Sequence, residues 1–213
     1  MKSNNDPFDV PRPDPSILIS AKSPFEQKLW IAGISIGLLG GTYLLVTILS
    51  ALENGLFPDT GWFGYLGNWG TVPLGTIFAL IGVTHFVQKE TFTGIVPPIG
   101  TWGGLWQVPA PGAEELDLSY EEYHTYWTGI AEVLGGLILA STGLGILPQW
   151  IQQCDAFLLL LLTLAVTPAN VYMATHDAQM VGGPPPMAYP DSHIFRGFIQ
   201  IVLLADFWKL AFH

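Results

Sequence analysis

Charged side chains are scarce in this chain: they make up 11% of its 213 residues, against roughly a quarter in an average soluble domain. Seven residues are lysine or arginine and the net charge is −10, so no basic patch is available to hold a phosphate backbone. We therefore expect no nucleic acid partner. The single cysteine, Cys154, excludes an internal disulfide and a Cys-x-x-Cys redox pair.

Hydrophobic residues make up 50% of the chain, and several apolar runs are long enough to cross a bilayer as helices. The lipid bilayer is therefore the first expected partner. The sequence predicts an all-α fold, a polytopic membrane helix bundle, with spans at about 29–52, 71–87, 124–147, 152–174 and 194–212.

Three units follow from this pattern. Residues 1–28 are rich in proline and cannot bury enough apolar surface to fold alone, so we expect an extended arm that another chain orders. Residues 29–52 form an extra transmembrane helix. Residues 71–213 form a four-helix membrane domain. Aromatic residues between the first two spans suit the headgroup layer, which predicts an interfacial loop over about 53–69.

The extra helix carries Gly33, Gly37 and Gly41 at four-residue spacing. This small-xxx-small pattern allows close approach of a second helix. We expect the three glycines to face a neighbouring protein subunit, with the helix at the edge of the bundle.

Basic residues indicate an orientation. In the five-span arrangement only Lys209 falls on one side, and all other Lys and Arg residues fall on the opposite side. The positive-inside rule then places the N-terminus on the cytoplasmic or stromal side. A plastid thylakoid and a bacterial inner membrane both satisfy this pattern.

The central span contains one carboxylate, Glu132, and an acid within a spanning helix suggests a functional site. Glu121 and His124 form a single Glu-x-x-His motif at the start of this span. A di-iron bundle requires that motif on two helices, with further carboxylates. We therefore predict no metal site.

Polar side chains from four spans are expected to gather near one membrane surface, because an unpaired polar group within the bilayer is costly. One interpretation is an internally satisfied network, in which Arg196 neutralises Glu132 and Asn170 bonds backbone freed by Pro168. The other is a pocket for a quinone, a thiol, a metal or a pigment headgroup, with quinone or chlorophyll as the cofactors considered, since these side chains can ligate a metal or bond a carbonyl. The candidate cofactor-binding residues are His85, Glu132, Asn170, His176, Arg196 and Gln200.

Four short motifs, taken in order, resemble the DoxX-like family of small integral membrane proteins over about residues 71–213. They are Thr84-His85-Phe86 with Phe92 and Ile95-Val96-Pro97-Pro98, Ala131-Glu132-Val133-Leu134-Gly135-Gly136, Pro168-Ala169-Asn170-Val171-Tyr172-Met173 with His176, and Arg196 and Gln200 with Trp208. The resemblance implies a four-helix membrane core. Some members of that family are linked to thiosulfate:quinone oxidoreduction, and others to membrane assemblies that handle oxidative or thiol stress.

Two functions follow. The first is a non-catalytic accessory or structural subunit of a larger membrane complex, respiratory or photosynthetic, with other membrane protein subunits as partners. The second is a quinone- or thiol-linked oxidoreductase subunit. In that alternative His85 and Glu132 would move protons while Arg196 holds an anionic or carbonyl group.

Overall fold

The computed structural model of the chain describes residues 12–55, 70–182 and 188–212, and every regular element in those ranges is helical. The expected all-α class is confirmed for this part of the chain. The helices are α1 (Pro24–Gly55), α3 (Thr71–Val87), α4 (Lys89–Thr93), α5 (Thr101–Gly104), α6 (Tyr120–Gly143), α7 (Gln149–His176) and α8 (Asp191–Phe212), preceded by the 3-10 turns η1 (Pro15–Ile17) and η2 (Ile19–Ala21).

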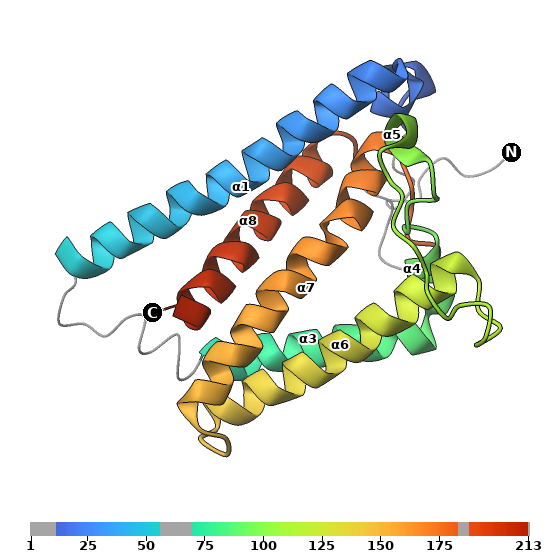
Figure 1. Ribbon diagram of the computed structural model, residues 1–213. Helices are drawn as coiled ribbons and strands as arrows, with labels where there is room; N and C mark the ends of the chain where they lie inside the picture. The colour runs from blue at the N-terminus through green and yellow to red at the C-terminus, as the bar shows by residue number, and fades with distance from the viewer. Residues whose placement is uncertain (1–11, 56–69, 183–187, 213) are drawn as a thin grey trace, which may run out of the picture.

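The long helices form two antiparallel pairs, α3 with α6 and α7 with α8 (Figure 1). The pairs meet where α6 contacts α7, and they diverge toward the side on which α4 and α5 lie. α1 runs along the outer side of α8. Its direction is parallel to α8, since Gly41 faces Ile201 and Glu53 contacts Lys209.

All four paired helices contribute to one hydrophobic core. Phe78 of α3 meets Phe207 of α8 edge-to-face, with ring centroids 5.2 Å apart. This contact joins α3 of one pair to α8 of the other, so both pairs share the core. The buried members of the cluster are Leu139, Leu159, Leu160, Leu162, Leu204 and Phe207.

Glycines bring the backbones of α3 and α6 into contact. A methyl group added at Gly75 would overlap the carbonyl oxygen of Gly136, and one added at Gly82 would lie 2.7 Å from the carbonyl oxygen of Gly129. Only residues without a β-carbon allow this approach. The resulting interface fixes which side chains of α3 lie opposite α6.

Two helices begin earlier in the sequence than predicted, because capping residues stabilise an additional first turn. Ser119 and Glu122 form a capping box, so α6 begins at Tyr120 rather than at 124. Glu122 also pairs with Lys89 at 2.6 Å, and this hydrogen bond raises the pKa of Lys89. α1 begins at Pro24, where Ser23 and Glu26 bond each other in the same reciprocal way.

The glycines of α1 differ in their surroundings. None of the 32 residues of α1 is buried, and no described residue lies within 4 Å of a β-carbon added at Gly33 or Gly37. Gly41 instead packs on Ile201 of the same chain. The expectation that all three face a neighbour is therefore wrong for Gly41, because α8 already covers it.

The predicted arm folds back on its own chain. Leu18 is buried, with 6% of its surface exposed, and the guanidinium of Arg12 lies 2.7 Å from the Asp177 carboxylate. An extended arm ordered only by a partner is thus wrong for residues 12–28. Residues 1–11, and residues 56–69 of the expected interfacial loop, lie outside the described residues.

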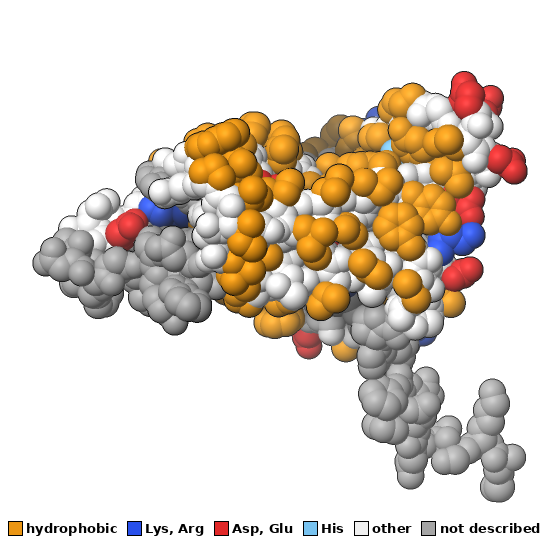
Figure 2. All heavy atoms as spheres, turned by 90° about the horizontal axis from the view of Figure 1, so that it is seen from below, with side chains coloured by type: hydrophobic (Ala, Val, Ile, Leu, Met, Phe, Trp, Pro, Cys, Tyr) orange, Lys and Arg blue, Asp and Glu red, His pale blue; other side chains and the backbone are white. Residues whose placement is uncertain are grey.

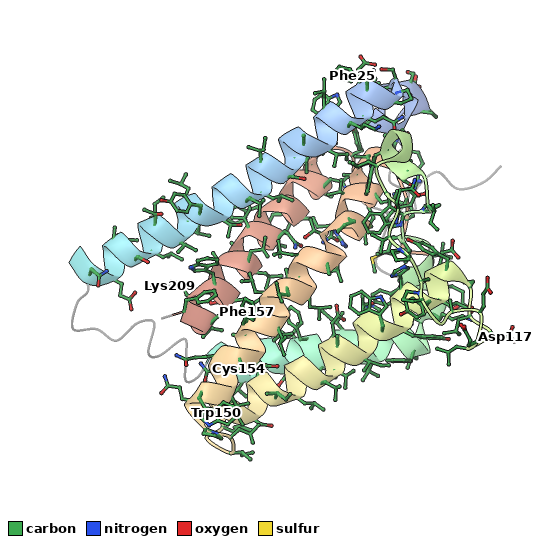
Figure 3. The ribbon with its side chains drawn as sticks, in the orientation of Figure 1. Phe25, Asp117, Trp150, Cys154, Phe157 and Lys209 are labelled. Atoms are coloured by element: carbon green, nitrogen blue, oxygen red, sulfur yellow. The ribbon has the colours of Figure 1, made fainter. Side chains whose placement is uncertain are left out.

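The helix directions define two ends of the bundle. We call the end where α1, α6 and α8 begin, and where α3 and α7 finish, the basic end. It carries Arg12, Lys22, Lys28, Lys89 and Arg196, whereas Lys209 lies near the opposite end of α8 (Figure 3).

Apolar side chains cover the outside of the bundle between these ends. On the face in Figure 2 they spread across the middle, and charged groups gather toward the two ends. Two described helices, Pro24–Gly55 and Gln149–His176, are long and apolar enough to cross a membrane by length and composition. These features support membrane association.

Replacing Gly136 with alanine should destabilise the α3–α6 pair, because the new methyl group would overlap the Ala79 backbone nitrogen. Overpacking of this kind costs about 1–3 kcal/mol. Unfolding by SDS in mixed micelles measures the loss. Gly33→Ala is the matched control, since it adds the same atom in open space. Wild-type stability of Gly136→Ala would contradict the close packing.

Candidate functional site

The six predicted site residues fall into three groups. Asn170, Arg196 and Gln200 form one hydrogen-bonded chain between α7 and α8. His85 and Glu132 form a second group between α3 and α6. His176 belongs to a third group with aromatic residues of the α5 segment. Within the described residues no hydrogen bond or ion pair joins one group to another, so the contacts form three groups rather than the single network expected from the sequence.

His85 and Glu132 are buried against each other. His85 Nδ1 lies 3.0 Å from the Ile81 carbonyl oxygen, which can only accept, so this nitrogen carries the proton and directs it to Ile81. Glu132 Oε2 lies 3.4 Å from the same nitrogen but forms no hydrogen bond. Phe92 stacks on the imidazole with a centroid distance of 3.7 Å. The two side chains therefore lie within ion-pair distance of each other, but Glu132 Oε2 lacks a hydrogen bond from the described residues.

The Arg196 side chain ends a hydrogen-bond chain that starts on the α7 backbone. Gln200 Nε2 donates to the Thr163 carbonyl oxygen and to Thr167 Oγ1, both at 2.9 Å. Asn170 Nδ2 donates to Gln200 Oε1 at 2.9 Å, and Arg196 Nη1 donates to Asn170 Oδ1 at 2.7 Å. Each amide is used at both its nitrogen and its oxygen, which fixes the position of the guanidinium.

The expected Arg196–Glu132 ion pair is wrong. Among the described residues the partners of Arg196 are Asn170 and Met180, and the basic side chain within 4 Å of Glu132 is that of His85. The helix pairing explains the difference, because α8 packs on α7 whereas Glu132 lies on the face of α6 that meets α3 at His85.

The expected role of Asn170 toward the backbone is also wrong. Pro168 has no N–H, so the carbonyl of Leu164 loses its usual helical donor. Asn170 donates to Gln200 instead, and Gln200 is the side chain that reaches the α7 backbone, at the neighbouring Thr163 carbonyl. The Asn170 amide thus links the side chains of Gln200 and Arg196.

His176 lies in an aromatic group that sequence reasoning did not assemble. Trp102 is 3% exposed and donates through Nε1 to Thr175 Oγ1 at 2.9 Å. Thr175 Oγ1 in turn lies 2.8 Å from His176 Nδ1. Trp102 adopts left-handed backbone angles, with φ 56°, and neighbouring glycines in the sequence are the signal that could have indicated this turn.

His124 is held in a state that does not suit a metal. Trp127 Nε1 donates to His124 Nδ1 at 3.0 Å, so a neutral ring carries its proton on Nε2. That buried Nε2 has no hydrogen-bond partner in the described part of the chain. A protonated nitrogen cannot ligate a metal, and across residues 12–55, 70–182 and 188–212 no group of three His, Cys, Asp or Glu side chains is placed to hold one.

Asp155 is a buried acid that the sequence analysis did not single out. Its residue surface is 4% exposed, and Oδ2 has no hydrogen-bond partner within the described ranges. A β-carbon at Gly135 would lie 3.5 Å from Oδ1, so the carboxyl packs against α6. An acid in a leucine-rich helix was the available signal. Its neighbour Cys154 is exposed near the start of α7 (Figure 3).

The fold and the site define an all-helical protein with a polar chain between its helices and two apolar helices of membrane-spanning length. The chain belongs to the family described as "Domain of unknown function (DUF8561)", whose model matches residues 74–211. That range includes all six predicted site residues and excludes α1. No curated protein and no solved structure matches the chain.

A double-mutant cycle tests the revised pairing. Asn170→Ala and Arg196→Gln should show a coupling of about 0.5–3 kcal/mol in unfolding free energy, because the two side chains share a hydrogen bond. Glu132→Gln and Arg196→Gln, which share none, should be additive within about 0.5 kcal/mol. SDS-induced unfolding in mixed micelles provides both values. Coupling confined to the Glu132 cycle would restore the original pairing.

Proposed function

We propose that this protein is a non-catalytic integral membrane subunit that packs into a larger respiratory or photosynthetic membrane complex through α1. The observation that carries the proposal is the exposure of this helix. α1 has 32 residues and none is buried, and it lies outside residues 74–211, the range matched by the family. A helix added to a domain that closes without it, and left open on its outer side, is suited to contact a neighbour.

The open side of α1 has the shape of a helix-packing surface. A shallow hollow of about 410 Å³ is lined by Leu29, Trp30, Gly33 and Ile34. Gly33, Gly37 and Gly40 each have no atom within 4 Å of an added β-carbon. Small residues flanked by large apolar ones allow a second helix to approach closely within lipid.

The membrane-spanning core of the proposal consists of α3, α6, α7 and α8. These helices contain 17, 24, 28 and 22 residues, which corresponds to roughly 26–42 Å against a hydrocarbon core of ~30 Å. Polar residues such as Glu132 and Gln200 are buried, whereas Leu134 and Phe198 are exposed on the same helices. A polar interior with an apolar exterior suits a bundle surrounded by lipid.

Under this proposal the basic end faces the cytoplasm or stroma, in line with the positive-inside rule, of a bacterial inner membrane or a plastid thylakoid. The DoxX-like resemblance remains a prediction. The order and antiparallel pairing of α3, α6, α7 and α8 are compatible with the four-helix core that it implies.

Gly37→Leu should disrupt assembly, because the larger side chain would fill the open face of α1 that a partner helix needs. We expect the yield of co-purifying membrane subunits to fall at least several-fold, measured by quantitative mass spectrometry after extraction in mild detergent.

Gly197→Leu is the matched control, since Gly197 is also open but lies on α8. Its partner yield should stay at the wild-type level. Unchanged yields in both variants would refute the role of α1, and equal losses in both would show a general effect of added bulk.

A quinone- or thiol-linked oxidoreductase subunit is the second candidate, favoured by one observation. The buried Glu132 Oε2 has no hydrogen-bond partner among the described residues and lies 3.4 Å from His85 Nδ1. A carboxyl and an imidazole so placed can accept and pass a proton during quinone reduction.

Quinone reduction by a small dithiol tests this candidate in the purified chain. If it is correct, the rate above the uncatalysed reaction should fall by about 10²–10⁴-fold in Glu132→Gln, the range typical of a lost acid–base group. Glu121→Gln, an equivalent change on the same helix, should retain the rate. Wild-type protein with no rate above background would remove this candidate and leave the first.

A further inference from the structure

Among the residues that the structure describes, the guanidinium of Arg196 has no anionic partner. It is half-buried, and no carboxylate in the described part of the chain lies within 4 Å of it. Its acceptors are the neutral Asn170 Oδ1 at 2.7 Å and the Met180 sulfur at 3.7 Å. Asp177, the acid at the end of α7, is already paired with Arg12 at 2.7 Å. A buried charge with only neutral partners is costly unless a counter-ion joins it.

The described residues use only a small part of the hydrogen-bonding capacity of this group. A guanidinium has five N–H donors, and the acceptors that the described residues supply are one amide oxygen and one thioether, which is a weak acceptor. The fork of donors suits two oxygens of one phosphate or carboxylate group. Arg196 can therefore bind an oxyanion without losing its contact with Asn170.

A second unsatisfied group lies one helical turn away. His193 and Arg196 are three residues apart on α8, so they share a face. Both ring nitrogens of His193 are buried and have no hydrogen-bond partner within residues 12–55, 70–182 and 188–212. Buried polar atoms are normally satisfied by protein, water or a bound group. Two such residues side by side indicate that a ligand completes this site.

We propose that Arg196, positioned by Asn170 and flanked by His193, binds the phosphate group of an anionic membrane lipid. The position favours a lipid over a soluble anion. The site lies between the end of α7 and the start of α8, at the basic end, where a spanning bundle meets the headgroup layer. Basic pockets between transmembrane helices commonly hold anionic headgroups. This inference rests on the membrane location proposed above.

Native mass spectrometry in mild detergent tests the proposal with two added lipids. Dioleoyl phosphatidylglycerol carries the phosphate, and dioleoylglycerol has the same acyl chains without it. Wild-type protein should retain the phospholipid and bind dioleoylglycerol at least tenfold more weakly. Arg196→Gln should weaken phospholipid binding about tenfold or more, as expected for a lost charged hydrogen bond.

Asn170→Asp is the second variant, in case Arg196→Gln does not fold. It has nearly the same size and places a carboxylate beside Arg196 Nη1, although it loses the hydrogen bond that Asn170 donates to Gln200 Oε1. The guanidinium gains an internal counter-ion, so phospholipid binding should again fall about tenfold in protein whose helical circular dichroism matches the wild type. Lys28→Gln is the charge-matched control at the same end, since Lys28 is exposed, and its binding should change less than twofold.

Three results would overturn the proposal. The first is equal weakening in Lys28→Gln and Arg196→Gln, which would indicate non-specific attraction. The second is unchanged binding in both site variants. The third is complete replacement of the phospholipid by excess inorganic phosphate at the same site, which would identify a soluble anion as the ligand.

Extraction of native membranes with alkaline carbonate separates this inference from the membrane location. Protein that stays in the membrane but binds no phospholipid would refute the lipid site alone. Protein released by carbonate would refute both the site and the membrane-embedded subunit.

Discussion

Direct backbone contact between α3 and α6 is the constraint on which the arrangement of this protein depends. Gly75 faces Gly136 and Gly82 faces Gly129 so closely that a β-carbon at any of these positions would overlap the other helix. The same contact places the β-carbon of His85 over Gly129 and its imidazole beside Glu132. The remaining helices then close one core around this pair through Phe78, which meets Phe207.

The second pair is organised by polar contacts rather than by glycine. Gln200 donates a hydrogen bond to the Thr163 carbonyl. Asn170 donates to Gln200 and accepts from Arg196, so the guanidinium is held in place by the two amides. Because each amide bonds at both ends, the polar atoms of these two side chains are largely satisfied inside an apolar bundle. The guanidinium is the exception, since the partners that the described residues give it are neutral. A satisfied chain that ends in an unsatisfied charge is the arrangement expected where a protein receives an external group.

Much of the fold followed from hydrophobic length. The predicted span at 71–87 agrees with α3, and the other long helices differ by a few residues at their ends. At the starts of α6 and α1 the difference arises from capping by Ser119 and Ser23, which extends each helix beyond its apolar run. The site was harder to predict. The structure joins Asn170, Arg196 and Gln200 by hydrogen bonds. Glu132 was paired with the wrong cation, because the sequence did not show which helices pair.

The sequence by itself determined the all-helical class, several of the polar residues that the bundle encloses, and the concentration of basic residues at one end, because each depends on residue type and spacing along a single helix. The tertiary structure decided which polar groups meet. A helix has several faces, and only packing selects the one that contacts a neighbour. Among the described residues, that selection joined His85 to Glu132, gave Arg196 no carboxylate, and placed Gly41 against α8 while Gly33 and Gly37 stayed open.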